Sequence, residues 1–148
     1  MFLLLSALVS CKRFALLYAG SNGFYNYRHQ ADIFTIYNQL LARGFTYYDM
    51  AVYAYNDIAT DSANPFTGQV FHSIDHKVNV FPGDHAINCK GDKVTAHILY
   101  NALSTLPTSR NDYIFMYYDN HGGPGILGVP DGCGEDIAAA SLAEAFTN

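Results

Sequence analysis

The hydrophobic positions of the chain follow two spacings, one typical of buried strands and one typical of helices. Residues 14–19 (FALLYA) form a continuous apolar run, as expected of a strand buried on both faces. Residues 24–30 are dense in polar and aromatic groups and predict a loop. Residues 31–43 place apolar side chains at helical spacing, and Gly44 stands where a helix commonly ends. Residues 49–55 (DMAVYAY) predict a second strand.

The same types of segment continue after a long irregular stretch at 56–93. An amphipathic helix is predicted over 94–106 and a third strand over 112–118, and residues 126–129 are expected to form one arm of a small hairpin. A capping box from Ser141 to Glu144 predicts the start of a third helix. Strand, helix and strand within about 40 residues form a βαβ unit, so we expect an α/β fold with a mostly parallel sheet.

Composition fits one globular domain, since the chain has 148 residues of which 50% are hydrophobic. The net charge is −5, and the 8 lysines and arginines form no basic patch, which excludes nucleic acid as the main partner. The glycines after the first strand match neither GxGxxG nor a P-loop, so we expect no nucleotide and no other cofactor.

The first ten residues, MFLLLSALVS, form an apolar stretch of signal-peptide length that is too short to span a bilayer. We interpret residues 1–11 as a signal peptide and residues 12–148 as the folded domain, so we expect the chain to enter the secretory pathway. The stretch lacks the basic start of a typical signal, so an N-terminal strand or a misplaced gene start remains an alternative.

Polar side chains follow the first and third predicted strands. Asn26, Arg28 and His29 come after the first, and His121 with Gly122 follows the third. Ligands bind beyond the carboxyl ends of parallel strands, so these side chains are expected at one rim of the sheet. There an imidazole can transfer protons and a glycine N–H can bind an oxyanion. The alternative is a loop histidine at a strand end and an ordinary ion pair between Arg28 and a neighbouring acid such as Asp32.

A zinc site is the other chemistry that the sequence could suggest. His72 and His76 are four residues apart, as are His85 and Cys89. However, a proline–glycine turn separates the two pairs, and neither CxxC nor HExxH occurs. We therefore expect solvated loop histidines and no metal.

Several segments resemble the legumain-type asparaginyl endopeptidases, which are caspase-like cysteine peptidases. The longest is AGSNGFYNYRHQAD, which is similar to the signature after the first strand of that family, and YYDNHGG is similar to its catalytic histidine motif. The resemblance spans about residues 14–130 and also includes YNDIA (55–59), NPFTG (64–68) and VNVFPGD (78–84).

The resemblance implies a caspase-like three-layer sandwich that cleaves peptide or protein substrates after asparagine, and sometimes aspartate, in a lysosome-like or vacuolar compartment. Together with the predicted signal peptide, it leads us to expect that the chain follows the secretory pathway to such a compartment or is secreted. It assigns His121 as the catalytic histidine, Gly122 to the oxyanion hole and Asn26 to orienting the histidine. It further assigns Arg28 and His29 to the pocket for the substrate asparagine.

The resemblance leaves the nucleophile unassigned. In related caspases the cysteine lies about 50 residues after the histidine, which from His121 falls beyond residue 148. Cys133 follows by only 12 residues, Cys89 precedes the third strand and Cys11 adjoins the leader. We therefore expect a catalytic domain truncated before the nucleophile strand and inactive by itself. A truncated gene, a fragment and a short inactive paralogue are the three explanations.

Two other functions fit the same motifs. The catalytic subunit of the GPI-anchor transamidase has a similar histidine motif, and a non-catalytic paralogue could bind asparagine-containing peptides or regulate a protease. If the third strand lacks an outer neighbour, Ile114, Phe115 and Met116 would leave an apolar sheet edge through which copies of the chain could associate.

Overall fold

The computed structural model describes residues 11–106 and 109–147, so the predicted signal peptide lies outside the described residues apart from Cys11. Its main sheet contains the three strands that the sequence predicts, and all of its strand pairs are parallel. The strand order is β2–β1–β3, with β1 (Arg13–Ala19) in the centre between β2 (Met50–Tyr53) and β3 (Tyr113–Asp119). The predicted parallel sheet is therefore confirmed.

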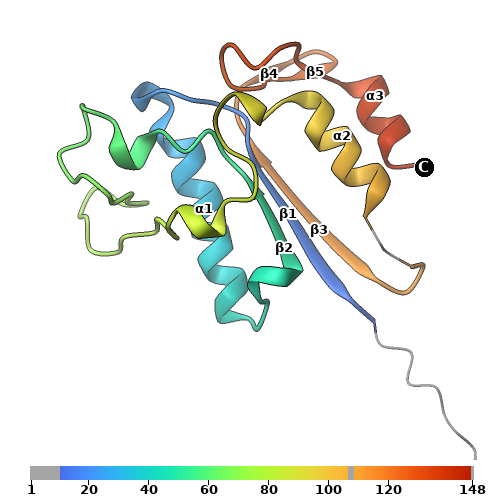
Figure 1. The fold of residues 1–148 in the computed structure, drawn as a ribbon, viewed down its shortest axis with the longest axis horizontal. Coiled ribbons are helices and arrows are strands. Elements are labelled where there is room, and N and C mark those ends of the chain that lie inside the picture. Colours follow the sequence, from blue (N-terminus) through green and yellow to red (C-terminus); the bar gives the residue numbers. More distant parts are fainter. Residues whose placement is uncertain (1–10, 107–108, 148) are drawn as a thin grey trace, which may run out of the picture.

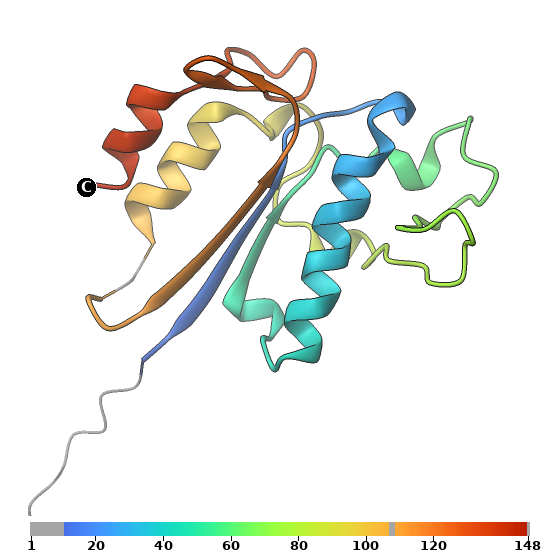
Figure 2. The same cartoon turned by 180° about the vertical axis from the view of Figure 1, so that it is seen from behind.

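Helices cover both faces of this sheet and complete a three-layer arrangement. Helix α1 (Tyr27–Ala42) packs on one face, while α2 (Ala96–Thr105) and α3 (Ala139–Ala145) lie together on the other (Figures 1 and 2). The α/β sandwich expected from the sequence is thus confirmed. Within the described part of the chain, no helix is both long enough and apolar enough to cross a bilayer.

A second, small antiparallel sheet lies in the chain between β3 and α3. Its strand order is β4–β5–β6, and Gly122 pairs with Leu127 in its hairpin. The hairpin arm predicted near residue 126 is therefore present. The remaining short elements are β4 (Gly122–Gly123), β5 (Ile126–Leu127), β6 (Ile137–Ala138) and the 3-10 turns η1 (Phe24–Asn26), η2 (Tyr47–Asp49), η3 (Ile58–Thr60), η4 (Asp84–Ala86) and η5 (Gly91–Lys93).

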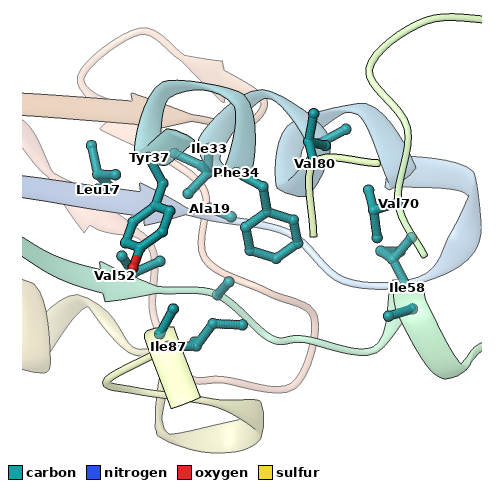
Figure 3. Packing of buried hydrophobic residues seen from close by; sticks show 14 of the residues in the cluster. Leu17, Ala19, Ile33, Phe34, Tyr37, Val52, Ile58, Val70, Val80 and Ile87 are labelled. Carbon is teal, nitrogen blue, oxygen red and sulfur yellow. The ribbon is translucent and has the colours of Figure 1, made fainter. Parts of the chain in front are cut away.

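Strand β1 is the centre of two hydrophobic clusters, because side chains of a strand point alternately to its two faces. Leu17 packs toward α1 together with Phe34 and Val52, as Figure 3 shows. Leu16 and Tyr18 pack toward α2 on the opposite face. All three of these β1 side chains have 0% exposure, which explains the unbroken apolar run in the sequence.

Helix α1 begins four residues earlier than the sequence predicts, so the expected loop over 24–30 is wrong. The turn η1 leads directly into α1, and Arg28 and His29 lie in the first turn of that helix. His29 and Gln30 are 4% and 1% exposed. Apolar spacing could not reveal this start, because polar side chains occupy the buried positions there. The predicted helix end is correct, since Gly44 takes a left-handed φ of 83°.

The long segment between β2 and α2 is irregular but ordered by side-chain amides. Asn64 is 5% exposed, and its Nδ2 donates to the carbonyls of Ile58 and Gln69 at 3.0 and 2.9 Å. Asn38 of α1 donates to the carbonyl of Val80 at 2.8 Å. These amides satisfy backbone groups that would otherwise be unpaired in a buried loop.

Helices α2 and α3 begin in different ways. Thr95 caps α2 by accepting a hydrogen bond from the N–H of Ile98 at 3.2 Å. The predicted capping box at Ser141 is wrong, because α3 starts at Ala139 directly after β6. Pairing of β6 with β5 fixes the chain direction two residues before Ser141, so the helix begins without that cap.

Candidate active site

The carboxyl ends of β1 and β3 bring the two predicted motifs to one rim of the sheet. Ala19 is in register with Asp119, and the N–H of Gly20 donates to the carbonyl of Asp119 at 3.0 Å. The loops that carry Asn26 and His121 therefore leave the sheet side by side. The expectation that these two motifs meet holds, because parallel neighbouring strands end at the same edge.

Small residues allow the two loops to approach closely. Asn120 donates a short hydrogen bond from Nδ2 to the carbonyl of Gly20, and Gly128 donates to the carbonyl of His121 at 3.0 Å. A Cβ at Gly20 would lie 2.7 Å from the carbonyl oxygen of Gly128. A Cβ at Gly128 would lie 2.6 Å from Nδ2 of Asn120. The glycines therefore permit the contact that places His121.

The ring of His121 contacts the side chain of Asn26. Its Nε2 lies 3.1 Å from Oδ1 of Asn26, while Nδ2 of Asn26 donates to the carbonyl of Asn22 at 3.1 Å. The second bond fixes which end of the amide faces the ring. Because Oδ1 can only accept, we infer that Nε2 carries the proton and that Nδ1 holds the lone pair.

Arg28 approaches the same ring nitrogen. Its Nη2 lies 3.3 Å from Nε2 of His121, and its Nη1 donates to the carbonyl of Tyr25 at 3.4 Å. A guanidinium can only donate, so it cannot share a protonated Nε2 with Asn26. With Nε2 protonated, the contact places the guanidinium beside the ring nitrogen without a hydrogen bond, and Arg28 is itself exposed.

His29 lies behind His121 rather than beside the solvent. Its Nδ1 lies 2.7 Å from Oγ of Ser21, and its ring meets that of His121 edge-on at 5.0 Å. Burial, followed by the charges of Arg28 and His121, lowers the pKa of His29, so its ring is neutral near pH 7. Its substrate contact stays a prediction, since the observed contacts are with Ser21 and His121.

Two carboxyl groups lie next to this site, and neither was predicted as part of it. Burial, and then the hydrogen bond and charge of Asp32, raise the pKa of Asp119 to about 6, against a smaller opposing effect of Arg28. Oδ1 of Asp32 also lies 3.1 Å from Nδ1 of His72. The sequence indicated Asp32 only as an ion-pair partner for Arg28, and no local signal indicated its contact with Asp119, which lies at the end of β3.

A cavity of about 320 Å³ opens beside the His121 ring. The loop after β1 and the loop at 129–136 both line it, and they are joined where the Asp131 N–H donates to Oδ1 of Asn22 at 2.9 Å and Nδ2 of Asn22 donates to the Asp131 carbonyl at 3.2 Å. Its lining includes Asn26, His121, Gly122, Gly123, Asp131 and Asp136. An imidazole and an exposed glycine pair thus border one cavity.

The cysteines lie elsewhere in the described part of the chain. Cys133 is 4% exposed, with its Sγ 3.8 Å from the carbonyl of Gly91. Burial, followed by the charge of Asp92, raises the pKa of Cys133, so its thiolate is disfavoured. Cys89 pairs with Tyr53 beyond the β2 edge, on the other side of the sheet from β3. Cys11 precedes β1, at the opposite end of that strand from His121.

The histidines considered as zinc ligands have other neighbours. His76 packs against the rings of Phe66 and Phe71 at 4.6 and 5.1 Å, and His72 contacts Asp32. Across residues 11–106 and 109–147, no group of three or more His, Cys, Asp or Glu side chains is arranged to hold a metal ion.

Comparisons with known proteins agree with the motifs of the rim. The chain is 39% identical over 127 residues to a hemoglobinase of Schistosoma japonicum, covering 80% of this chain and 30% of that protein. It is 37% identical over 132 residues to a vacuolar-processing enzyme of Vicia sativa, covering 81% of this chain and 26% of that protein. The chain thus spans between about a quarter and a third of the length of these relatives.

The family model that matches this chain includes both the motif after β1 and the motif after β3. Residues 13–148 match the model of the Peptidase C13 family. This match starts at β1 and includes the loops after β1 and β3 as well as the small sheet. The chain therefore belongs to the peptidase C13, or legumain, family of cysteine endopeptidases.

Proposed function

We propose that residues 12–148 form part of the catalytic domain of a legumain-type cysteine endopeptidase that cleaves protein substrates after asparagine, and sometimes after aspartate. The observation that carries this proposal is the contact of 3.1 Å between Nε2 of His121 and Oδ1 of Asn26 at the shared rim of β1 and β3. It supplies an oriented imidazole beside an open cavity.

In this proposal, Nδ1 of His121 takes the proton of an attacking thiol and later donates it to the leaving amine. Asn26 keeps the Nε2 proton in place, so the lone pair stays at Nδ1. The N–H of Gly122 contributes to the oxyanion site. Arg28 donates to the side-chain carbonyl of the substrate asparagine, and His29 forms part of the pocket wall behind that side chain.

We further propose that none of the three cysteines in these 148 residues is the nucleophile. The burial and raised pKa of Cys133, the position of Cys89 beyond β2 and that of Cys11 before β1 support this. No cysteine lines the cavity beside His121 within the described residues. The chain by itself is then unable to form an acyl-enzyme.

A fluorogenic Ala-Ala-Asn substrate tests both parts of the proposal. The 148-residue chain should show no thiol-dependent turnover, with His121→Ala as the matched control. Turnover that Cys133→Ala abolishes would refute the account of the nucleophile. The same chain joined to the remainder of a C13 catalytic domain should gain activity that His121→Ala and Asn26→Ala each remove. Activity that persists in both variants would refute the assigned roles.

The names of the relatives support a compartment. One is a hemoglobinase and another a vacuolar-processing enzyme, so we place this chain in the secretory pathway, directed to a vacuolar or lysosome-like compartment. Localisation of a tagged chain together with a vacuolar marker tests this. Uniform cytosolic signal would contradict it.

We also propose that the isolated chain associates with itself through β3. Tyr113, Ile114 and Phe115 are 71%, 46% and 42% exposed, and the outer edge of β3 pairs with no strand in the described residues. Such an edge presents unpaired backbone groups to other chains. Light scattering should show oligomers at micromolar concentration, and a monomer that melts cooperatively would count against this association.

A further inference from the structure

The carboxylate of Asp57 accepts hydrogen bonds from both ends of the segment 23–30, which carries the side chains that contact His121. Oδ2 of Asp57 accepts the N–H of Gly23 at 2.6 Å, and its Oδ1 accepts Nε2 of Gln30 at 2.7 Å. Asp57 comes from the loop after β2, so it is remote in sequence from both partners. Asn26, Arg28 and His29 lie between the two tied residues.

The two ties are of a kind that restricts movement. Gln30 is 1% exposed, and its Oε1 has no hydrogen-bond partner in the described structure. The buried amide group is therefore held by the bond from Nε2 to Asp57. Gly23 has a left-handed φ of 79°, and its carbonyl accepts the N–H of Asn26 at 2.9 Å. Hydrogen bonds to an ionised carboxylate are stronger than those between neutral groups.

Displacement of either tied residue would move Asn26. Gly23 begins the turn η1 that ends at Asn26, and Gln30 lies in the first turns of α1 directly after Arg28 and His29. The contact of 3.1 Å between Asn26 and His121 tolerates little displacement, because hydrogen bonds weaken steeply with distance and angle.

We propose that Asp57 is a positioning residue for His121, acting by fixing the segment from Gly23 to Gln30. Its catalytic meaning rests on the proposed function, but the geometric effect can be measured on this chain without any turnover. Failure of the peptidase assay and failure of this inference are therefore separate results.

The test compares Asp57→Ala and Asp57→Asn with the control Asp61→Ala in the ¹⁵N-labelled full chain. Asp61 lies in the same loop, and its Oδ1 accepts the N–H of Ala63 at 2.8 Å, away from the tied segment. Long-range ¹H–¹⁵N spectra report which nitrogen of His121 carries the proton. Amide hydrogen exchange compares Gly23 with Leu17 in the core of β1.

In Asp57→Ala, the Gly23 amide should exchange roughly tenfold faster or more, as expected for a lost charge-assisted hydrogen bond. The His121 ring signals should also shift toward a mixture of both tautomers. In Asp57→Asn, the side-chain oxygen still accepts from Gly23, and the new amide can donate to Oε1 of Gln30 once the Gln30 amide turns over. Asp61→Ala should resemble the wild type, and Asp57→Asn should keep the wild-type His121 ring signals while its Gly23 amide, bonded to a neutral oxygen, exchanges at an intermediate rate.

Unchanged His121 ring signals in Asp57→Ala would overturn the inference, even if Gly23 exchanged faster. Equal acceleration at Gly23 and Leu17 would also overturn it, because the effect would then be general destabilisation. If Asp57→Ala does not fold, Gln30→Met releases one tie only and should shift the His121 ring signals in the same direction. An unaltered ring in that variant would refute the inference equally.

Discussion

Replacing Asp119 by asparagine should change how the stability of the chain depends on pH. Asp119 is half-buried at the end of β3, and its pKa is raised from 3.8 to about 6 by burial first and then by its hydrogen bond to Asp32. The folded state therefore binds the proton more tightly than the unfolded state. This contribution to stability is complete below about pH 4, and it is lost as the pH rises through about 6.

The size of the effect follows from the same values. A change in pKa from 3.8 to about 6 corresponds to about 3 kcal/mol at roughly 1.4 kcal/mol for each tenfold change in proton affinity. Asp119 is only partly buried, so solvent screening reduces the expected contribution to about 1–2 kcal/mol. Asparagine stays neutral at every pH and can still donate to Asp32. The Asp119→Asn variant should therefore not lose this stability as the pH rises through about 6.

Urea unfolding of the wild type and of Asp119→Asn at pH 4, 5, 6 and 7 provides the assay, at a protein concentration low enough to keep the chain monomeric. The variant should become more stable than the wild type as the pH rises, by about 1–2 kcal/mol at pH 7 relative to the difference at pH 4. Titrating groups remote from Asp119 cancel in this comparison. Parallel stability curves, or a variant that loses stability relative to the wild type above pH 6, would refute the raised pKa of Asp119.

Three further outcomes are expected. Gly20→Ala should lower the free energy of unfolding by about 1–3 kcal/mol in urea titrations, because its Cβ would lie 2.7 Å from a backbone oxygen, and an unchanged midpoint would contradict that close approach. Thr95→Ala should cost about 1 kcal/mol through loss of the α2 cap, with Thr95→Ser retaining most of the stability. In the native chain, exposed Cys11 should react with a thiol reagent at least about tenfold faster than Cys133, and equal rates by mass spectrometry would argue against the burial of Cys133.

The main elements could be predicted from the sequence because buried positions are occupied by apolar residues, and the spacing of those residues differs between strands and helices. β1 is covered on both faces and so reads as an unbroken apolar run, while α2 is covered on one face and shows helical spacing. Gly44 marks the end of α1 because a left-handed residue favours glycine. The start of α1 was missed because His29 and Gln30 occupy buried positions, where each is held by a hydrogen bond that apolar spacing cannot indicate.

The sequence by itself determined that Asn26 follows the first strand and His121 the third, and that the chain carries the motifs of its family; the structure then showed that these two strands are neighbours. The order of residues along the chain is sufficient for the assignment from sequence, because strand-forming and turn-forming residues determine the backbone conformation of their own short segment. Only the tertiary structure showed that Asp57 accepts hydrogen bonds from both ends of the Asn26 segment, that burial and Asp32 raise the pKa of Asp119, and that His29 lies behind the His121 ring. These are contacts between residues distant in sequence, and their strength depends on burial and distance, which the packed chain alone fixes.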